Sequence, residues 1–225
     1  MDKRNERRGG FYWIKDKPYI SVTNILKVID KPAIRYWYGN QIYWAMVKEP
    51  DLDEGSAMQK PWETSGKAKD RGSTVHSIVE AWKNIGEVRG TELDEFGGYA
   101  TAFDNWRKDY TVNPIEHEKT VISKHGYAGT LDLLAEVNGK KCLIDVKTNK
   151  DANIYDEVQL QLSAYRQALR EEGIEVDEMY ALALGDDGKY KFKSFEEDIK
   201  TFLHAKKLWE WANKTKCEKV GYAGN

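Results

Sequence analysis

Cysteine is scarce in this chain, which has only Cys142 and Cys217 among its 225 residues. Two cysteines exclude both a disulfide framework and a four-cysteine metal or iron–sulfur site. Long apolar runs are also missing, and none approaches the ~18–20 residues that cross a membrane as a helix. We therefore expect no iron–sulfur cluster and no membrane partner.

The chain also lacks a strong net charge of either sign. Its net charge is −2 and its pI is near 6.2, so no global basic field attracts it to nucleic acid. Any nucleic-acid contact must then use a local patch or a cleft. The opening residues, MDKRNERRGG, contain no apolar segment of the kind found in secretory signals, and their acidic residues suit a transit peptide poorly. These features predict a cytoplasmic protein.

The rest of the composition is that of a globular protein, with 40% hydrophobic and 32% charged residues. A chain of this length predicts one domain, 1–225. Strand-like and helix-like patterns alternate along it, which predicts an α/β fold with a central mixed β-sheet flanked by helices. Within the domain we expect an N-terminal arm and helical elaboration over residues 1–70, a core over 71–195 and a C-terminal helix over 196–225.

Five expectations concern residues 1–70. Residues 1–10 are charged and end in Gly-Gly, which predicts a mobile arm. Ser21 is expected to cap a short helix with its side chain, and a second helix should follow from Lys31 to Lys48. The aromatic residues of that second helix can stack on bases or pack against the body, and packing is favoured for any single one. Residues 49–70 are polar and predict a loop.

The most informative stretch is a predicted β-hairpin around Asn138-Gly139. This dipeptide lies between two apolar, β-rich runs and is the strongest short-range signal for a two-residue type I′ turn. Counting outward from that turn places Asp132 opposite Asp145, where Cβ atoms are about 4.5–5.5 Å apart and like charges repel. Lys147 follows two residues later on the same face, about 6–7 Å further along. Two acids and a lysine on one strand face predict a catalytic site that holds a divalent metal.

The alternative is a solvated sheet face, on which such charges need no special role. Against it, the strand around Asp145 is almost continuously apolar, as strands buried on both faces are. Charges on such a strand are rare unless they are paired or bind a metal. The metal site is therefore the favoured interpretation.

Two helices carry further candidates. On the predicted helix 71–82, His76 and Glu80 lie four residues apart beside an apolar stripe. A histidine in that position is more often a hydrogen-bonded structural residue than a metal ligand. On the predicted helix 153–172, Gln161 falls on the same buried stripe as Tyr165. A buried glutamine without a partner costs about 1–3 kcal/mol, so it needs either a core hydrogen bond or a site to contact.

Three motifs occur in order: Gly129-x-x-Asp132, Asp145-x-Lys147 and Gln161-x-x-x-Tyr165. Together they resemble the signature of the RecB-like branch of the PD-(D/E)XK nucleases, and the segment from Arg71 to His76 resembles the motif that precedes the catalytic hairpin in that branch. The resemblance spans most of the chain. It implies a restriction-endonuclease-like sheet.

The resemblance further implies a metal shell in which Asp132, Asp145, the Val146 backbone carbonyl and His76 bind Mg²⁺ or Mn²⁺. Carboxylates combined with an imidazole suit Mn²⁺ somewhat better than an all-oxygen shell would. Lys147 would position or activate the attacking water, while Gln161 and Tyr165 would reach a phosphate or that water. Three further residues are candidates for accessory roles: Glu80, Arg71 and Glu118. For Glu118 a solvated or structurally paired side chain is the favoured interpretation, and Glu80 on a helix surface needs no special role.

The expected function is a metal-dependent DNA exonuclease, without an iron–sulfur cluster, that hydrolyses phosphodiester bonds in recombination, repair or phage DNA processing. Its substrate would be single-stranded DNA or duplex ends. A recombinase, a single-strand annealing protein and a homo-oligomer are possible partners, and the compartment would be a bacterial or phage-infected cytoplasm. Two alternatives stay open: a structure-specific or restriction-type endonuclease, and a non-catalytic nucleic-acid-binding module.

Overall fold

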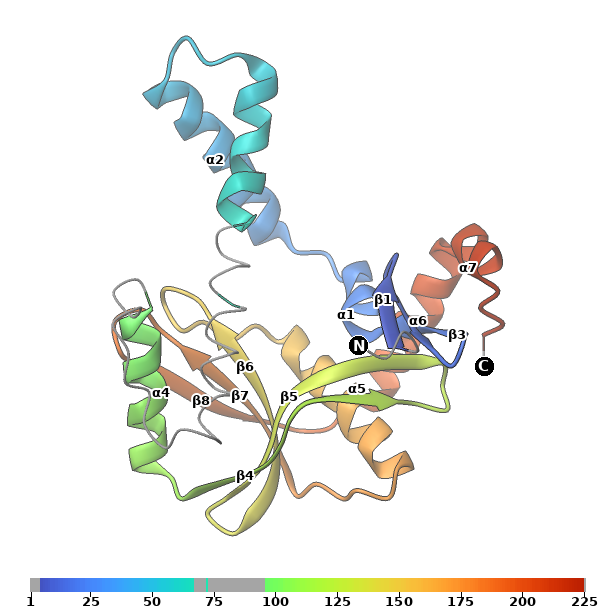
Figure 1. Cartoon of the computed structure of the whole chain (residues 1–225). Helices are drawn as coiled ribbons and strands as arrows, with labels where there is room; N and C mark the ends of the chain where they lie inside the picture. The colour runs from blue at the N-terminus through green and yellow to red at the C-terminus, as the bar shows by residue number, and fades with distance from the viewer. Residues whose placement is uncertain (1–4, 67–71, 73–95, 225) are drawn as a thin grey trace.

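The computed structural model describes residues 5–66, Gly72 and residues 96–224. Its described part is built on an eight-stranded sheet with helices on both faces (Figure 1). The predicted α/β class with a central mixed sheet is therefore confirmed. The strands are β1 Asn5–Arg8, β2 Phe11–Ile14, β3 Lys17–Ser21, β4 Val112–Ile122, β5 Tyr127–Val137, β6 Lys140–Thr148, β7 Glu178–Leu184 and β8 Tyr190–Phe195.

The helices fall into three regions of the chain. In the N-terminal region they are α1 Val22–Ile25, the 3₁₀ turn η1 Leu26–Val28 and α2 Pro32–Lys48. The core contains α4 Gly97–Asp109 and α5 Glu157–Glu171, and the chain closes with α6 Ile199–Ala212 and α7 Lys214–Val220. No helix among the described residues is long and apolar enough to cross a membrane.

The predicted central hairpin is present in the predicted register. Asn138 and Gly139 have φ values of 50° and 81°, the two left-handed positions of a type I′ turn. Val137 pairs with Lys140, and the antiparallel ladder runs back to Leu133 and Ile144. On the far side of β6, strand β7 pairs in parallel, so the sheet is mixed.

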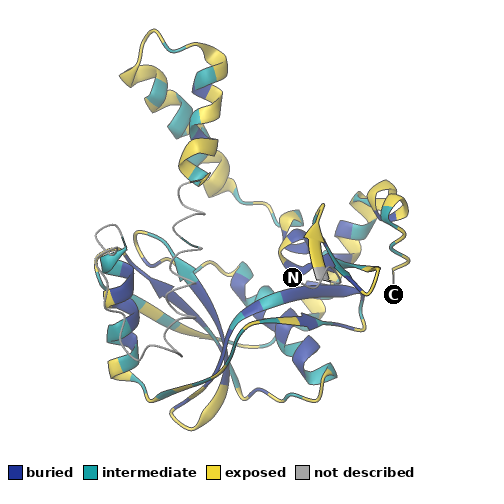
Figure 2. Cartoon of the chain, viewed as in Figure 1, coloured by how far each residue is buried: buried dark blue, intermediate teal, exposed yellow. Residues whose placement is uncertain are grey.

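Two apolar clusters hold the helices against the two faces of the sheet (Figure 2). Helix α4 packs Phe103 and Trp106 against one face, which includes Leu133, Cys142 and Ile144. The other cluster joins α1, α5 and α6 to the opposite face. Consecutive residues of β6 therefore alternate between two buried faces, which explains why this strand reads as almost continuously apolar.

The prediction of a mobile arm is wrong for residues 5–8. They form β1, which pairs antiparallel with β2, and Gly9 and Gly10 both have positive φ values, 61° and 87°. The Gly-Gly pair is therefore a hairpin turn. The strand keeps its charges because it is an edge strand, and the Arg8 guanidinium lies 4.5 Å from the centre of the Trp13 ring.

The predicted side-chain cap at Ser21 is also wrong. Ser21 precedes α1 in an extended conformation, but its side chain makes no capping hydrogen bond. Its hydroxyl instead contacts the Thr23 hydroxyl at 2.9 Å, and Arg7 Nη2 donates to Thr23 Oγ1 at 2.8 Å. The neighbouring strand β1, which was not expected, supplies the competing partner.

The helical region at residues 31–66 differs from two predictions. Residues 54–66 are helical, where a loop was predicted, and they form a helical hairpin with α2 that projects from the sheet (Figure 1). Tyr38 and Trp62 connect its two helices through ring centroids 5.3 Å apart. Helix α2 has no buried residue, and the side chains of Tyr36 and Trp44 are 74% and 54% exposed. Packing against the body, the favoured interpretation of these aromatics, is therefore wrong.

Candidate active site

The candidate site lies where strand β6 leaves strand β5. Along one edge of β5, strand β4 pairs with residues from Ala128 to Val137. The other edge is shared, because β3 pairs in parallel with Tyr127 and Ala128, whereas β6 pairs antiparallel from Leu133 onward. Residues 129–132 lie between these two partners. Beyond Ile144, β6 continues beside β7 alone. We call this place, formed by residues 129–132 and 145–148, the fork.

Asp132 and Asp145 lie at the mouth of the fork, one step beyond the last bonded pair. The register places Asp132 and Asp145 opposite each other, as predicted, but the ladder of paired residues ends at Leu133 and Ile144 and does not include them. Asp132 Oδ2 instead accepts a hydrogen bond from the Val146 backbone N–H at 2.7 Å. A carboxylate thus takes the place that a strand carbonyl would occupy, and it holds the two strands at the point where they separate.

Asp145 is 2% exposed, and its Oδ1 has no hydrogen-bond partner among the described residues. Its one charged contact there is an ion pair between Oδ2 and the Lys147 ammonium at 2.7 Å. A buried carboxylate is costly unless it is paired and hydrogen-bonded on both oxygens. The arrangement leaves Asp145 with oxygen positions that a cation can occupy.

Helix α5 brings Gln161 and Tyr165 to the fork, whereas their spacing predicted only that they share one stripe of the helix. Lys147 Nζ donates to Gln161 Oε1 at 3.5 Å, and Gln161 Nε2 donates to the Tyr165 hydroxyl at 3.2 Å. Gln161 is half-buried rather than fully buried, so its partners are the fork residues and not the core. A short polar chain therefore links Asp145 to Tyr165.

Gly129 makes room for the Tyr165 ring. A Cβ at this position would lie 2.4 Å from Tyr165 Cε1, a distance that real Cβ atoms essentially never show. The glycine of the Gly-x-x-Asp motif thus has a packing role, because it lets an aromatic ring of α5 lie directly on β5.

The carboxylates shift the pKa values of their neighbours. Burial alone would lower the pKa of Lys147, but Asp145 and Asp132 outweigh it and raise that pKa above its ordinary value of 10.5. Burial raises the pKa of Tyr165 well above its ordinary value, and the same two carboxylates raise it further. Lys147 is therefore a fixed positive charge at neutral pH, and Tyr165 remains a neutral hydroxyl.

A row of hydroxyl groups beside the fork was missed from the sequence. The Tyr12 hydroxyl lies 3.2 Å from Thr130 Oγ1, which lies 3.3 Å from Thr120 Oγ1. Thr130 precedes Asp132 by two residues on β5. The two-residue spacing could have drawn attention to Thr130. Nothing in the local sequence indicates Tyr12, because β2 reaches the fork only through its pairing with β3.

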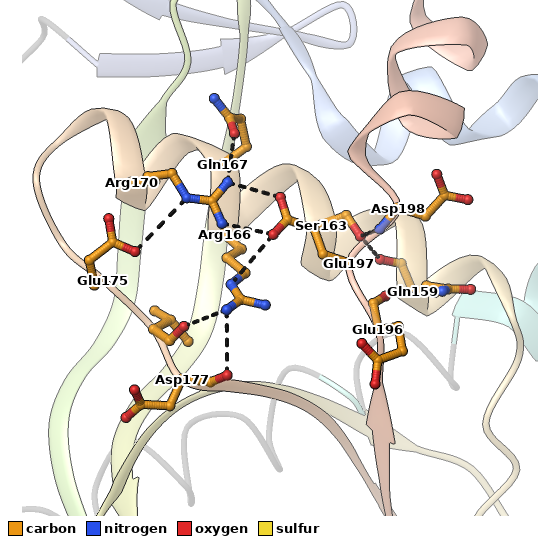
Figure 3. Close-up of polar contacts among 11 residues, drawn as sticks. Gln159, Ser163, Arg166, Gln167, Arg170, Glu175, Asp177, Glu196, Glu197 and Asp198 are labelled. Carbon is orange, nitrogen blue, oxygen red and sulfur yellow. Dashed lines mark hydrogen bonds and ion pairs between the residues drawn. The ribbon is translucent and has the colours of Figure 1, made fainter.

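Helix α5 is fixed in place by polar contacts to the segment between β8 and α6 (Figure 3). Arg170 donates to both carboxylate oxygens of Glu197, at 3.0 and 2.8 Å. The Asp198 backbone N–H donates to Ser163 Oγ at 2.8 Å. Paired bonds of this kind hold a helix in one orientation, which in turn fixes the side chains that α5 presents to the fork.

The remaining predicted site residues are Arg71, His76, Glu80 and Glu118. Arg71, His76, Glu80 and the helix predicted for residues 71–82 lie outside the described residues, apart from Gly72, which is helical. Glu118 is exposed on β4, between the partners of Leu133 and Leu131, so its backbone lies beside Asp132 on the edge of β5 opposite β6. Among the described residues, no group of three or more His, Cys, Asp or Glu side chains could hold a metal ion. The two aspartates and the Val146 carbonyl are thus the metal-ligand candidates that the described structure offers.

No family model matches this chain, and the search of curated proteins found no match. Among solved structures, the chain is similar to an alkaline exonuclease from Laribacter hongkongensis, with 13% identity, a TM-score of 0.45 and coverage of 92% of this chain and 91% of that one. It is also similar to a candidate exonuclease from Eubacterium rectale, with 14% identity, a TM-score of 0.48 and coverage of 91% and 82%.

Proposed function

We propose that the chain is a metal-dependent nuclease that hydrolyses phosphodiester bonds of DNA at the fork, acting from a free end. The observation that carries the proposal is Asp145, a buried carboxylate whose Oδ2 is paired with the Lys147 ammonium at 2.7 Å and whose Oδ1 has no hydrogen-bond partner among the described residues. With Asp132 beside it, the site has two anionic ligands and one ammonium group on a single strand face. A purely structural role does not explain why such charges are placed together.

The donor set fits a hard divalent cation. Carboxylate and backbone carbonyl oxygens are the ligands that Mg²⁺ and Mn²⁺ prefer. Asp132, Asp145 and the Val146 carbonyl would hold the ion, with His76 completing the shell as the resemblance to RecB-like nucleases implies. When bound, the metal would polarise the scissile phosphate and lower the pKa of a coordinated water.

The protein side chains supply the remaining chemistry. Lys147 keeps its charge and would offset the negative charge that develops on the phosphate as the water attacks, rather than accept the water's proton. Gln161 holds the lysine through its carbonyl oxygen and would orient it toward the phosphate. Hydroxyl groups of Tyr165, Tyr12 and Thr130 are further donors within reach of a phosphate oxygen or a bound water.

A substrate panel tests this proposal. End-labelled linear DNA, single- and double-stranded, a closed DNA circle and an RNA strand would each be incubated with Mg²⁺, Mn²⁺ or EDTA. We expect metal-dependent loss of linear DNA and an intact circle. Cleavage of the circle would replace the exonuclease with an endonuclease. Binding of DNA without cleavage under any metal would overturn the catalytic proposal and favour a non-catalytic binding module.

A further inference from the structure

One face of helix α6 carries a line of exposed basic and aromatic side chains. Lys200, His204, Lys207 and Trp211 follow one another at spacings of four, three and four residues, so they lie on the same side of the helix. All four are exposed, and Trp211 is 79% exposed. We call these four residues the α6 stripe.

The charge around the α6 stripe contrasts with that of the whole chain. Residues 199–220 contain six lysines and two glutamates, while the full chain has a net charge of −2. One of the glutamates, Glu210, is occupied by Lys206 at 2.6 Å and by the Tyr222 hydroxyl at 2.8 Å. Within the described residues, no carboxylate forms an ion pair with Lys200 or Lys207. The positive charge of the stripe is therefore available to an external anion.

A groove of about 350 Å³ runs beside the stripe. It is lined by His125, Lys200, Leu203, His204, Lys206 and Lys207. Two carboxylates lie close to it. Glu171 is 3.7 Å from His125 Nε2 and accepts from the Lys124 backbone N–H, and Asp198 accepts from the Thr201 backbone N–H at the start of α6. Both acids are thus hydrogen-bonded, although the charges of His204 and Lys200 also help to lower the pKa of Asp198, and the basic groups outnumber the two acids at the groove.

We propose that the α6 stripe is a binding surface for the phosphate backbone of a nucleic acid, separate from the fork. These four residues extend about 16 Å along the helix axis, the length over which a duplex rises by about five base pairs. Lysines contact phosphates without reading sequence, and an exposed tryptophan stacks on a base of an unpaired strand. The α6 side chains make none of the contacts described for the fork.

A membrane surface fits this helix less well. Helices that lie in a membrane interface bury an apolar face in the lipid. In α6 that face is already used, because Phe202 and Trp209 are 0% and 3% exposed in the core of the protein. A nucleic acid requires only the basic outer face. The inference rests on the proposed function in taking nucleic acid as the substrate, and it adds a surface that would hold the strand while the fork cleaves it.

Binding in a cleavage-deficient background tests the surface. Lys147→Ala protein would be titrated with fluorescein-labelled single-stranded and duplex DNA at several salt concentrations. Adding Lys200→Gln and Lys207→Gln should weaken binding and reduce the slope of log K against log salt by about two, since two phosphate contacts are lost. Trp211→Ala should weaken binding to the single strand more than to the duplex. The matched control is Lys108→Gln with Lys141→Gln, which removes two exposed lysines elsewhere. It should change neither the affinity for DNA nor the salt slope.

The outcomes separate the two proposals. If the wild type cleaves DNA but the Lys200→Gln and Lys207→Gln changes leave affinity and salt slope unaltered, the α6 stripe is not a binding surface and the nuclease stands. Reduced binding in that variant, without cleavage by the wild type under any metal, would keep the surface and overturn the nuclease. Absence of DNA binding by the parent protein, or binding of the stripe to anionic vesicles instead, would overturn the surface.

Discussion

The Asp132 carboxylate accepts a hydrogen bond from the Val146 backbone N–H at 2.7 Å, at the step where the ladder between β5 and β6 ends. One acidic side chain thus has two tasks: it holds two strands together as they separate, and in the proposed function it also binds the metal. These tasks need different chemistry, since the first requires only an acceptor and the second requires a negative charge.

Substitutions at Asp132 should separate those tasks. Asp132→Asn keeps an oxygen that can accept from Val146, so its free energy of unfolding should stay within about 1 kcal/mol of the wild type, while cleavage is lost. Asp132→Ala removes the acceptor and should cost a further ~1–3 kcal/mol. Urea unfolding of both variants, beside a cleavage assay, measures the difference. Equal stability of the two would contradict a structural role for the carboxylate.

Metal binding should depend on Asp145. If a divalent ion occupies the fork, a free concentration of about 100 times Kd stabilises the fold by about 2.7 kcal/mol, and the Tm rises accordingly. We expect Mn²⁺ to raise the Tm of the wild type, EDTA to reverse the rise, and Asp145→Asn to abolish it. A thermal shift measures this without cleavage. An undiminished shift in Asp145→Asn would place the metal elsewhere.

Gly129→Ala should displace the Tyr165 ring, because the new methyl group would lie 2.4 Å from Tyr165 Cε1. Overpacking of this kind typically costs about 1–3 kcal/mol of stability. It should also lower the cleavage rate, because it moves the Tyr165 hydroxyl and Gln161, which is hydrogen-bonded to it. Replacing Tyr165 with leucine should relieve the clash, so Gly129→Ala should cost less stability in a Tyr165→Leu background than in the wild type. A double-mutant cycle by urea unfolding measures the coupling, and additive costs would contradict the contact.

Acid should weaken the attachment of α5. The hydrogen bonds from Arg170 hold the pKa of Glu197 below its ordinary value of 4.5. A carboxyl group with a depressed folded pKa contributes stability that is complete above pH 4.5 and is lost as the pH falls through the folded pKa. Glu197→Gln should therefore be less stable than the wild type at pH 7, by about 0.5–1 kcal/mol, with the difference shrinking below pH 4.5. A difference that is constant from pH 7 to pH 3 would contradict this linkage.

The sequence predicts the hairpin well because its signals are local. Asn138-Gly139 defines the turn, the turn defines the register, and the register places Asp132, Asp145 and Lys147 on one face. The spacing of Gln161 and Tyr165 on one helix stripe is equally local. What the sequence does not give is the end of the ladder. That end depends on β7 and β3 pairing in parallel with strands distant from them along the chain.

The errors in the N-terminal region have the same origin. Gly9-Gly10 is a hairpin signal, but the charged residues around it favour the prediction of a mobile arm. Those charges are tolerated because β1 is an edge strand. The aromatics of α2 fall on several faces of the helix, which predicts that some pack against the body, but the helix packs mainly on residues 54–66 and projects from the sheet. The edge position of β1 and the exposure of α2 depend on tertiary structure, so the local spacing of residues does not predict them.

The most direct test of the fork as a catalytic site is a comparison of two lysines on strand β6. Lys147 contacts Asp145 at 2.7 Å in the fork, whereas Lys141 lies on the same strand at an exposed position outside it. Cleavage of end-labelled linear DNA with Mn²⁺ would be measured for Lys147→Ala and Lys141→Ala. We expect Lys147→Ala to lose at least 100-fold in rate, in the range found for removal of a charge-stabilising group, and Lys141→Ala to retain the wild-type rate. Equal rates for the two variants, or wild-type cleavage by Lys147→Ala, would contradict the account.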